Sequence, residues 1–71
     1  MENKNLIESL LEEIERVKEV KTVYEKESIG MSGRIAIIIM GQSITVAEKA
    51  ISTMDTVGMV RALDDLRKYE L

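Results

Sequence analysis

Apolar residues in the middle of the chain recur at helical spacing. Between residues 34 and 54 they follow steps of three and four, at Ile37, Met40, Ile44, Ala47, Ile51 and Met54. That is the spacing of one face of an α-helix. A parallel row consists mostly of small side chains, at Ala36, Met40, Ser43, Ala47, Ala50 and Met54. Because Ile35, Ile38 and Ile39 extend the apolar surface almost around the axis, we expect this helix to be buried on more than one side.

The same segment leaves one alternative open. The six apolar residues 35–40 also suit a strand buried on both faces, which would give an α+β fold with a strand at 34–41. Thr45 and Glu48 fit a capping box that would start a helix only at Val46. A doubly buried strand needs neighbours, however, and the chain offers at most one more candidate, at 20–25. The helical spacing also continues through the proposed boundary, so we favour a helix over 34–54.

The charged flanks predict two further helices. Residues 3–27 carry an apolar stripe at Ile7, Leu10, Ile14 and Val17, and Asn3 or Asn5 can cap its start. The stretch 28–33 is expected to form the turn, with Gly30 in the left-handed conformation and Ser32 capping the central helix. A final helix over about 57–69 would place Met59, Leu63 and Leu66 on one face, with Asp55 or Thr56 as its cap. The predicted fold is all-α, a helical hairpin plus a C-terminal helix in a single domain over residues 1–71.

Composition adds an expectation about assembly and excludes some chemistry. A chain of 71 residues has a small core, and such scaffolds commonly add disulfides, a metal or oligomerisation. The sequence holds no Cys and no His, which removes disulfides, the usual zinc sites and the common nucleophile pairs. We therefore expect a homo-oligomer that is not an enzyme, with no catalytic residue, no metal and no cofactor.

Charge bears on the choice of partner. The net charge is −3, and Lys and Arg are not concentrated in any stretch, which argues against DNA or RNA as a partner. The longest uninterrupted apolar run is far shorter than the roughly 18–20 residues that cross a bilayer, so no membrane contact is expected. The acidic, amphipathic N-terminus does not look like a targeting signal. The expected location is the cytoplasm, or the host cytoplasm if the protein is viral.

The central helix resembles a known family. The run IAIIIMGQSITVAEKAIS, residues 35–52, is similar to the second helix of the phage helical-hairpin proteins that act as anti-CBASS cyclic-nucleotide sponges. The positions that match, in register, are Ala36, Met40, Gly41, Gln42, Ser43, Lys49, Ala50 and Ile51. The chain departs from the family pattern at Ile37 and Ile38, where polar residues are usual. The resemblance implies a small, non-enzymatic homo-oligomer that sequesters cyclic di- or oligonucleotides used as immune signals.

A short set of residues is suited to such a ligand. Tyr24 offers an aromatic face for a base, while Lys26, Arg34 and Lys49 offer cations for phosphates, shared across an oligomer interface. Lys49 also falls on the family's basic position. Two other functions remain open, namely a protein-binding inhibitor or regulator that presents an apolar helix face, and a structural oligomerisation module.

Overall fold

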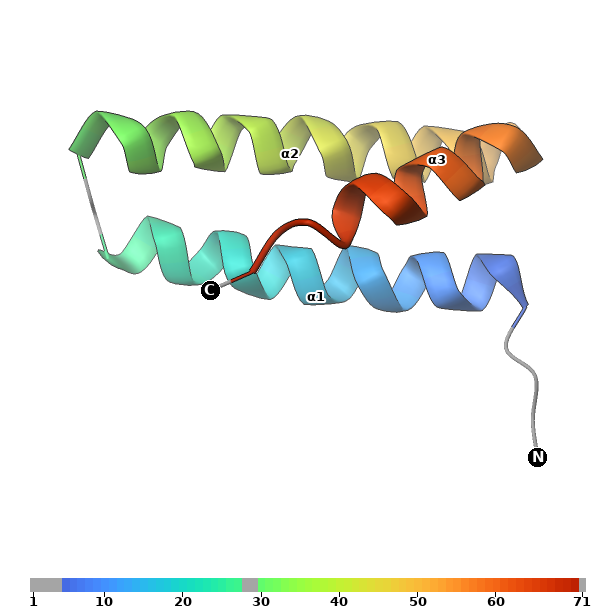
Figure 1. Ribbon diagram of the computed structural model, residues 1–71, viewed down its shortest axis with the longest axis horizontal. Coiled ribbons are helices and arrows are strands. Elements are labelled where there is room, and N and C mark those ends of the chain that lie inside the picture. The colour runs from blue at the N-terminus through green and yellow to red at the C-terminus, as the bar shows by residue number, and fades with distance from the viewer. Residues whose placement is uncertain (1–4, 28–29, 71) are drawn as a thin grey trace.

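The protein consists of three α-helices. The computed structural model describes residues 5–27 and 30–70, without the side chains of residues 31 and 32. The helices are α1 (Leu6–Glu27), α2 (Gly30–Ser52) and α3 (Thr56–Leu66). Helices α1 and α2 lie antiparallel, and α3 folds back from the end of α2 and contacts both (Figure 1). The all-α prediction of a helical hairpin plus a C-terminal helix is confirmed.

Helix α1 begins at a reciprocal cap. Asn5 Oδ1 accepts a hydrogen bond from the Glu8 backbone N–H at 2.8 Å, and Glu8 Oε1 accepts one from the Asn5 N–H at 3.1 Å. This capping box satisfies two N–H groups that have no partner within the helix. Asn5 is therefore confirmed as a cap, and the other predicted candidate, Asn3, lies outside the described residues. The buried face of α1 then follows the predicted spacing, with Leu10, Ile14, Val17 and Val20.

Helix α2 begins earlier than predicted. Gly30 has the predicted left-handed backbone, with a φ of 53°, but it is already the first residue of α2. Ser32 therefore lies inside the helix, and its predicted role as the cap is wrong. The rest of the predicted turn, at positions 28 and 29, lies outside the described residues. The alternative prediction of a strand at 34–41 is also wrong, because all of these residues are helical.

The second predicted start of a helix, at Val46, is wrong as well. Thr45 lies within α2, and its Oγ1 donates a hydrogen bond to the Gly41 carbonyl oxygen at 3.0 Å. A hydroxyl bonded to the carbonyl one turn earlier belongs to a helix interior rather than to a cap. Helix α2 is therefore continuous from Gly30 to Ser52.

The buried side of α2 is made of its smaller residues as much as of its larger ones. Its buried apolar side chains are Met40, Ile44, Ala47 and Ala50. Ala47 and Ala50 allow close approach of the neighbouring helices, since small side chains bring backbones together. An ideal Cβ on Gly58 of α3 would lie 3.4 Å from the Cβ of Ala50, which shows how closely α3 approaches α2.

The turn between α2 and α3 ends one helix and caps the next. The Asp55 N–H donates to the Ala50 carbonyl oxygen at 2.9 Å, and the Met54 N–H donates to that of Ile51 at 3.1 Å. This pair is a Schellman motif, with Met54 at the left-handed position, φ 55°. Met54 is 67% exposed, so its predicted place on the packed face is wrong. Of the two predicted caps of α3, Asp55 is the one observed, and its Oδ1 accepts a hydrogen bond from the Gly58 N–H at 3.0 Å.

The chain beyond α3 is held by an arginine of α1. Helix α3 ends at Leu66 rather than at the predicted residue 69. Arg16 donates from Nη2 to the Leu66 carbonyl oxygen at 2.9 Å and from Nη1 to that of Tyr69 at 2.7 Å. The same guanidinium contacts Glu13 Oε1 at 2.9 Å. These bonds satisfy carbonyls at the end of α3 and fix the C-terminal segment to α1.

Candidate binding surface

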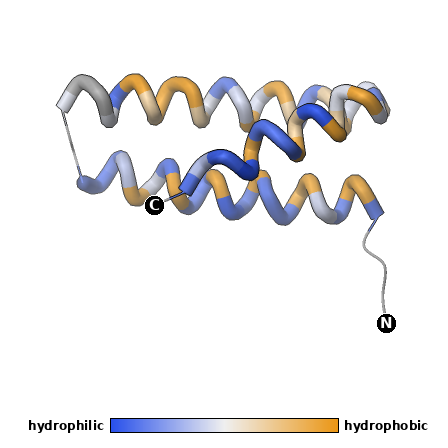
Figure 2. Tube along the Cα trace, in the orientation of Figure 1, coloured by the Kyte–Doolittle hydropathy of each residue, from blue (hydrophilic) through white to orange (hydrophobic). Residues whose placement is uncertain are grey.

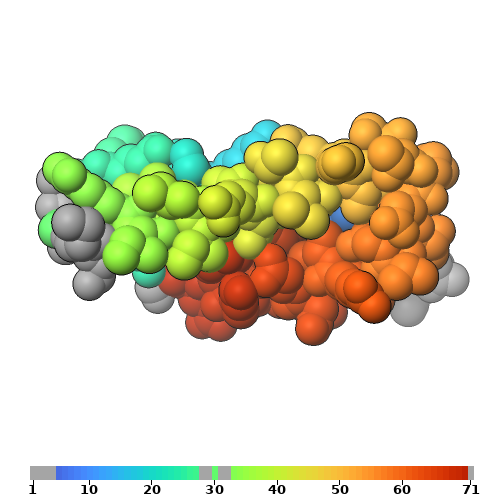
Figure 3. All heavy atoms as spheres, turned by 90° about the horizontal axis from the view of Figure 1, so that it is seen from above, coloured from blue at the N-terminus to red at the C-terminus, as the bar shows by residue number. Residues whose placement is uncertain are grey.

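The side of α2 that faces away from α1 carries large apolar side chains that no described helix covers. We call it the α2 outer face, formed by Ile35, Ile38, Ile39, Gln42, Thr45 and Val46. The exposed fractions are 59% for Ile38, 61% for Val46 and 50% for Ile35. Hydrophobic segments recur along α2 in Figure 2, and Figure 3 looks onto this side, where α2 runs along the molecule beside α3. Apolar groups gathered in this way are typical of an interaction surface.

A shallow hollow lies in the middle of this face. It is lined by Ile38, Gly41, Gln42, Thr45 and Val46. Gly41 has no side chain, and it occupies the edge of the face that is next to Lys21 of α1. The lining contains no charged group, so the hollow suits an apolar side chain better than an ion or a phosphate.

The α2 outer face is uncharged along most of its length. The thirteen residues between Arg34 and Glu48 contain no Asp, Glu, Lys or Arg. The part from Gly33 to Ser52 is the one helix among the described residues whose length and composition suffice to cross a membrane, a test that the core helix of a soluble protein also passes. Consecutive apolar residues form a shorter run than this segment, because uncharged residues such as Gly41 and Gln42 interrupt them.

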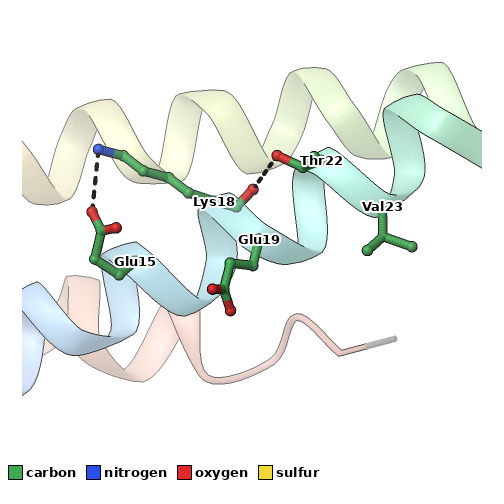
Figure 4. Close-up of a pocket in the computed structure, with 5 residues that line it drawn as sticks. All are labelled: Glu15, Lys18, Glu19, Thr22 and Val23. Atoms are coloured by element: carbon green, nitrogen blue, oxygen red, sulfur yellow. Dashed lines mark hydrogen bonds and ion pairs between the residues drawn. The ribbon is translucent and has the colours of Figure 1, made fainter.

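A second hollow, on α1, has a different character. Its lining is Glu15, Lys18, Glu19, Thr22 and Val23 (Figure 4). Lys18 Nζ lies 3.7 Å from Glu15 Oε2 and 3.4 Å from Glu48 Oε2 on α2. The Thr22 hydroxyl donates to the Lys18 carbonyl oxygen at 2.9 Å. These groups pair with one another at a solvated surface, so the hollow is a weak candidate for a ligand site.

The four residues predicted to bind a ligand do not form one site within a single chain. Tyr24 is partly buried against the core, and Lys26 is exposed in the last turn of α1. Arg34 is exposed near the start of α2, at the same end of the hairpin. Lys49 is exposed near the other end of α2. Fifteen residues separate it from Arg34, about 22 Å along a helix axis at 1.5 Å per residue.

A polar cluster joins the C-terminal segment to α2. Ser43 Oγ and the Tyr69 hydroxyl oxygen lie 2.8 Å apart, and Lys68 Nζ lies 5.2 Å from the centre of the Tyr69 ring. The hydrogen bond from Lys68 lowers the pKa of the Asp65 carboxyl below its usual value. Every member has a partner at the protein surface, so we interpret the cluster as structural.

Sequence spacing did not indicate the roles of Arg16 and Tyr69. Their contacts join positions 53 and 26 residues apart, between Arg16 and Tyr69 and between Ser43 and Tyr69 respectively. Local periodicity relates residues three or four apart, so it carries no signal for such pairs. The apolar surplus at Ile35, Ile38 and Ile39, in contrast, was visible in the sequence, and it marks the α2 outer face.

Comparison with known proteins adds no family. The chain matches no protein-family model, no curated protein and no solved structure.

Proposed function

We propose that this protein is a non-catalytic binding protein that works as a small homo-oligomer, with the α2 outer face as its contact surface. The observation that carries the proposal is the exposure of four large apolar side chains on one uncharged side of α2, namely Ile35, Ile38, Ile39 and Val46. The chain has enough residues for one small core, and these side chains lie outside it.

Burial of this face in an interface would be favourable. Full burial of a Val, Leu or Ile side chain contributes about 1.5–3 kcal/mol, so a side chain that is about half exposed retains roughly half of that. Summed over the four side chains, the gain is several kcal/mol before the loss of translational freedom is subtracted. An interface on this face therefore has a driving force that the charged outer surface of α1 lacks.

The test is the mass of the protein in solution. By size exclusion with light scattering at several hundred micromolar concentration, the wild-type chain should exceed the mass of one chain. Ile38→Lys should reduce it to a monomer, because an unpaired charge in an apolar contact is strongly unfavourable. Leu11→Lys is the matched control, since Leu11 is 49% exposed on α1, outside the proposed interface. A monomeric wild type would contradict self-association and would favour a different protein as the partner.

A second candidate function is the sequestration of a cyclic nucleotide, which follows from the family resemblance. One observation favours it: Tyr24, Lys26 and Arg34 lie at the same end of the hairpin, so an aromatic ring and two cations occupy one region (Figure 1). Lys49 lies at the other end of α2, so it can join them only from a second copy.

The nucleotide proposal is tested by thermal shift. A ligand that binds only the folded state stabilises it by about 2.7 kcal/mol at a hundredfold excess over Kd. A cyclic di- or oligonucleotide should raise the melting temperature of the wild type. Lys49→Ala should abolish the shift and leave the unliganded melting temperature roughly unchanged. If no cyclic nucleotide in the panel shifts the melting temperature, the proposal is contradicted.

A further inference from the structure

We propose that the α2 outer face binds the same face of a second copy of this chain, with the two α2 helices antiparallel and the twofold axis near Gly41. This inference rests on the proposed function, because it takes self-association through α2 as given. It adds the partner's orientation and register. Three features of the face support it: the shape of the hollow, the placement of the charges and the contrast with the other surfaces.

The hollow has the shape that accepts a side chain from a facing helix. Ile38, Gly41, Gln42 and Thr45 stand at positions i, i+3, i+4 and i+7 of α2. Four residues at this spacing form the hole that receives one side chain in knobs-into-holes packing. The missing side chain at Gly41 deepens the hole. Ile38, which lines one edge of this hole and is 59% exposed, also supplies the projecting side chain.

The hole and the projecting side chain lie within one turn of each other on the same helix. The α2 outer face is therefore self-complementary. In an isologous dimer the same patch contacts itself, so each Ile38 can enter the hole of the other copy. An axis that relates Ile38 of one copy to the middle of the partner's hole passes close to Gly41. The register of the proposed dimer follows from this geometry.

The charges at the two ends of the face favour the antiparallel orientation. Arg34 lies at one end, and Glu48 and Lys49 lie at the other. In a parallel pair each of these residues would face its own copy, which places like charges together. In the antiparallel pair Arg34 of each copy lies within about one helical turn of the partner's Glu48 and Lys49, so each end of the contact carries charges of both signs. This arrangement is less repulsive than the parallel one, which places like charges together, and it therefore favours the antiparallel orientation.

The outer surface of α1 is a poor partner for this face. The chain carries a net charge of −3, and the outer surface of α1 exposes Glu15, Lys18 and Glu19. Two acidic chains approach one another with least repulsion where neither has a charge, and that is the stretch from Arg34 to Glu48. A contact along one pair of helices falls at the low end of interface sizes, below roughly 800 Å² per partner. We therefore expect a reversible dimer whose population rises with concentration.

The orientation is tested by disulfide cross-linking, for which this chain has a clean background because it contains no Cys. A disulfide needs Cα atoms about 4.4–6.8 Å apart, so it reports which positions meet. Three single variants of the full chain are used, Gln42→Cys, Arg34→Cys and Glu48→Cys, with copper phenanthroline as the oxidant. Circular dichroism of each variant checks that the fold is retained.

The antiparallel dimer predicts a specific pattern. Gln42→Cys should cross-link to itself, because it lies near the axis. Arg34→Cys and Glu48→Cys should each fail to cross-link alone and should cross-link when the two variants are mixed. If the two variants cross-link alone and not in the mixture, the pair is parallel and the inference is overturned.

Two further outcomes separate this inference from the proposed function. A dimer in light scattering that cross-links at none of these positions would overturn the α2 pairing and leave self-association intact. A monomer in light scattering would overturn both. If that monomer also floated with phosphatidylcholine vesicles, the face would belong to a membrane, and the second copy would be excluded as its occupant.

Discussion

The two sides of α2 differ in burial, and the hydrophobicity of their residues alone does not predict which side is buried. The inner side, against α1 and α3, buries two alanines, Ala47 and Ala50, beside Met40 and Ile44. The outer side exposes large β-branched residues such as Ile38 and Val46. Where one helix must accommodate two neighbours, small side chains let the backbones approach, and this closeness decides which side is buried. The larger residues are left on the outside, where another molecule can cover them.

The largest expected difference between the two sides of α2 comes from truncating one buried and one exposed side chain. Met40 is 1% exposed, so Met40→Ala should lower the free energy of unfolding by about 2–5 kcal/mol through lost burial and the cavity it leaves. Ile38→Ala, on the outer side, should change it by less than about 0.5 kcal/mol. Urea unfolding followed by circular dichroism measures both, at a concentration low enough to keep the chain monomeric. Equal losses in the two variants would contradict the assignment of the sides.

Larger side chains at two neighbouring positions of α2 give a second comparison of its buried and exposed sides. Ala47 is fully buried and Val46 is 61% exposed. Ala47→Leu should destabilise the fold by about 1–3 kcal/mol, because the extra atoms force α1 and α3 away from α2. Val46→Leu is the matched control and should be nearly neutral. If Ala47→Leu were also neutral in thermal unfolding, close approach could not be the reason for burial of the small side chains.

The smallest expected effect concerns the turn that brings α3 onto the inner side. Met54 holds a left-handed backbone, φ 55°, which costs a residue other than glycine about 1–2 kcal/mol. Met54→Gly should therefore raise the free energy of unfolding, by about 1 kcal/mol after the greater flexibility of glycine in the unfolded chain is subtracted. Met54→Ala keeps a Cβ and serves as the control without this gain. Equal stability of the two variants in urea would show that the backbone at this position is not strained.

Most of the fold was predictable from spacing in the sequence, and the differences have local causes. Steps of three and four indicated all three helices. The start of α2 was placed too late because Gly30 and Gly33 resemble turn residues, whereas Gly33 is buried within the helix. The end of α2 was placed too late because a left-handed Met54 carries none of the glycine signal that usually marks such a position.

The candidate surface was partly predictable. The surplus of apolar residues at Ile35, Ile38 and Ile39 indicated burial beyond a single neighbour, and these residues are exposed in the single chain. Arg34 and Lys49 lie near opposite ends of α2, so the two cations predicted to share a ligand do not meet within one chain. The role of Arg16 was hidden for a related reason, since its partners lie at the far end of the sequence.

The central claim is that the α2 outer face is covered by another copy of the chain, and sedimentation equilibrium tests it most directly. The wild-type protein is measured from low micromolar to several hundred micromolar concentration, beside Ile38→Lys. The account predicts that the wild-type mass rises from 8.0 kDa towards twice that value, while the mass of the variant stays at that of one chain. A wild-type mass of 8.0 kDa at every concentration would contradict it.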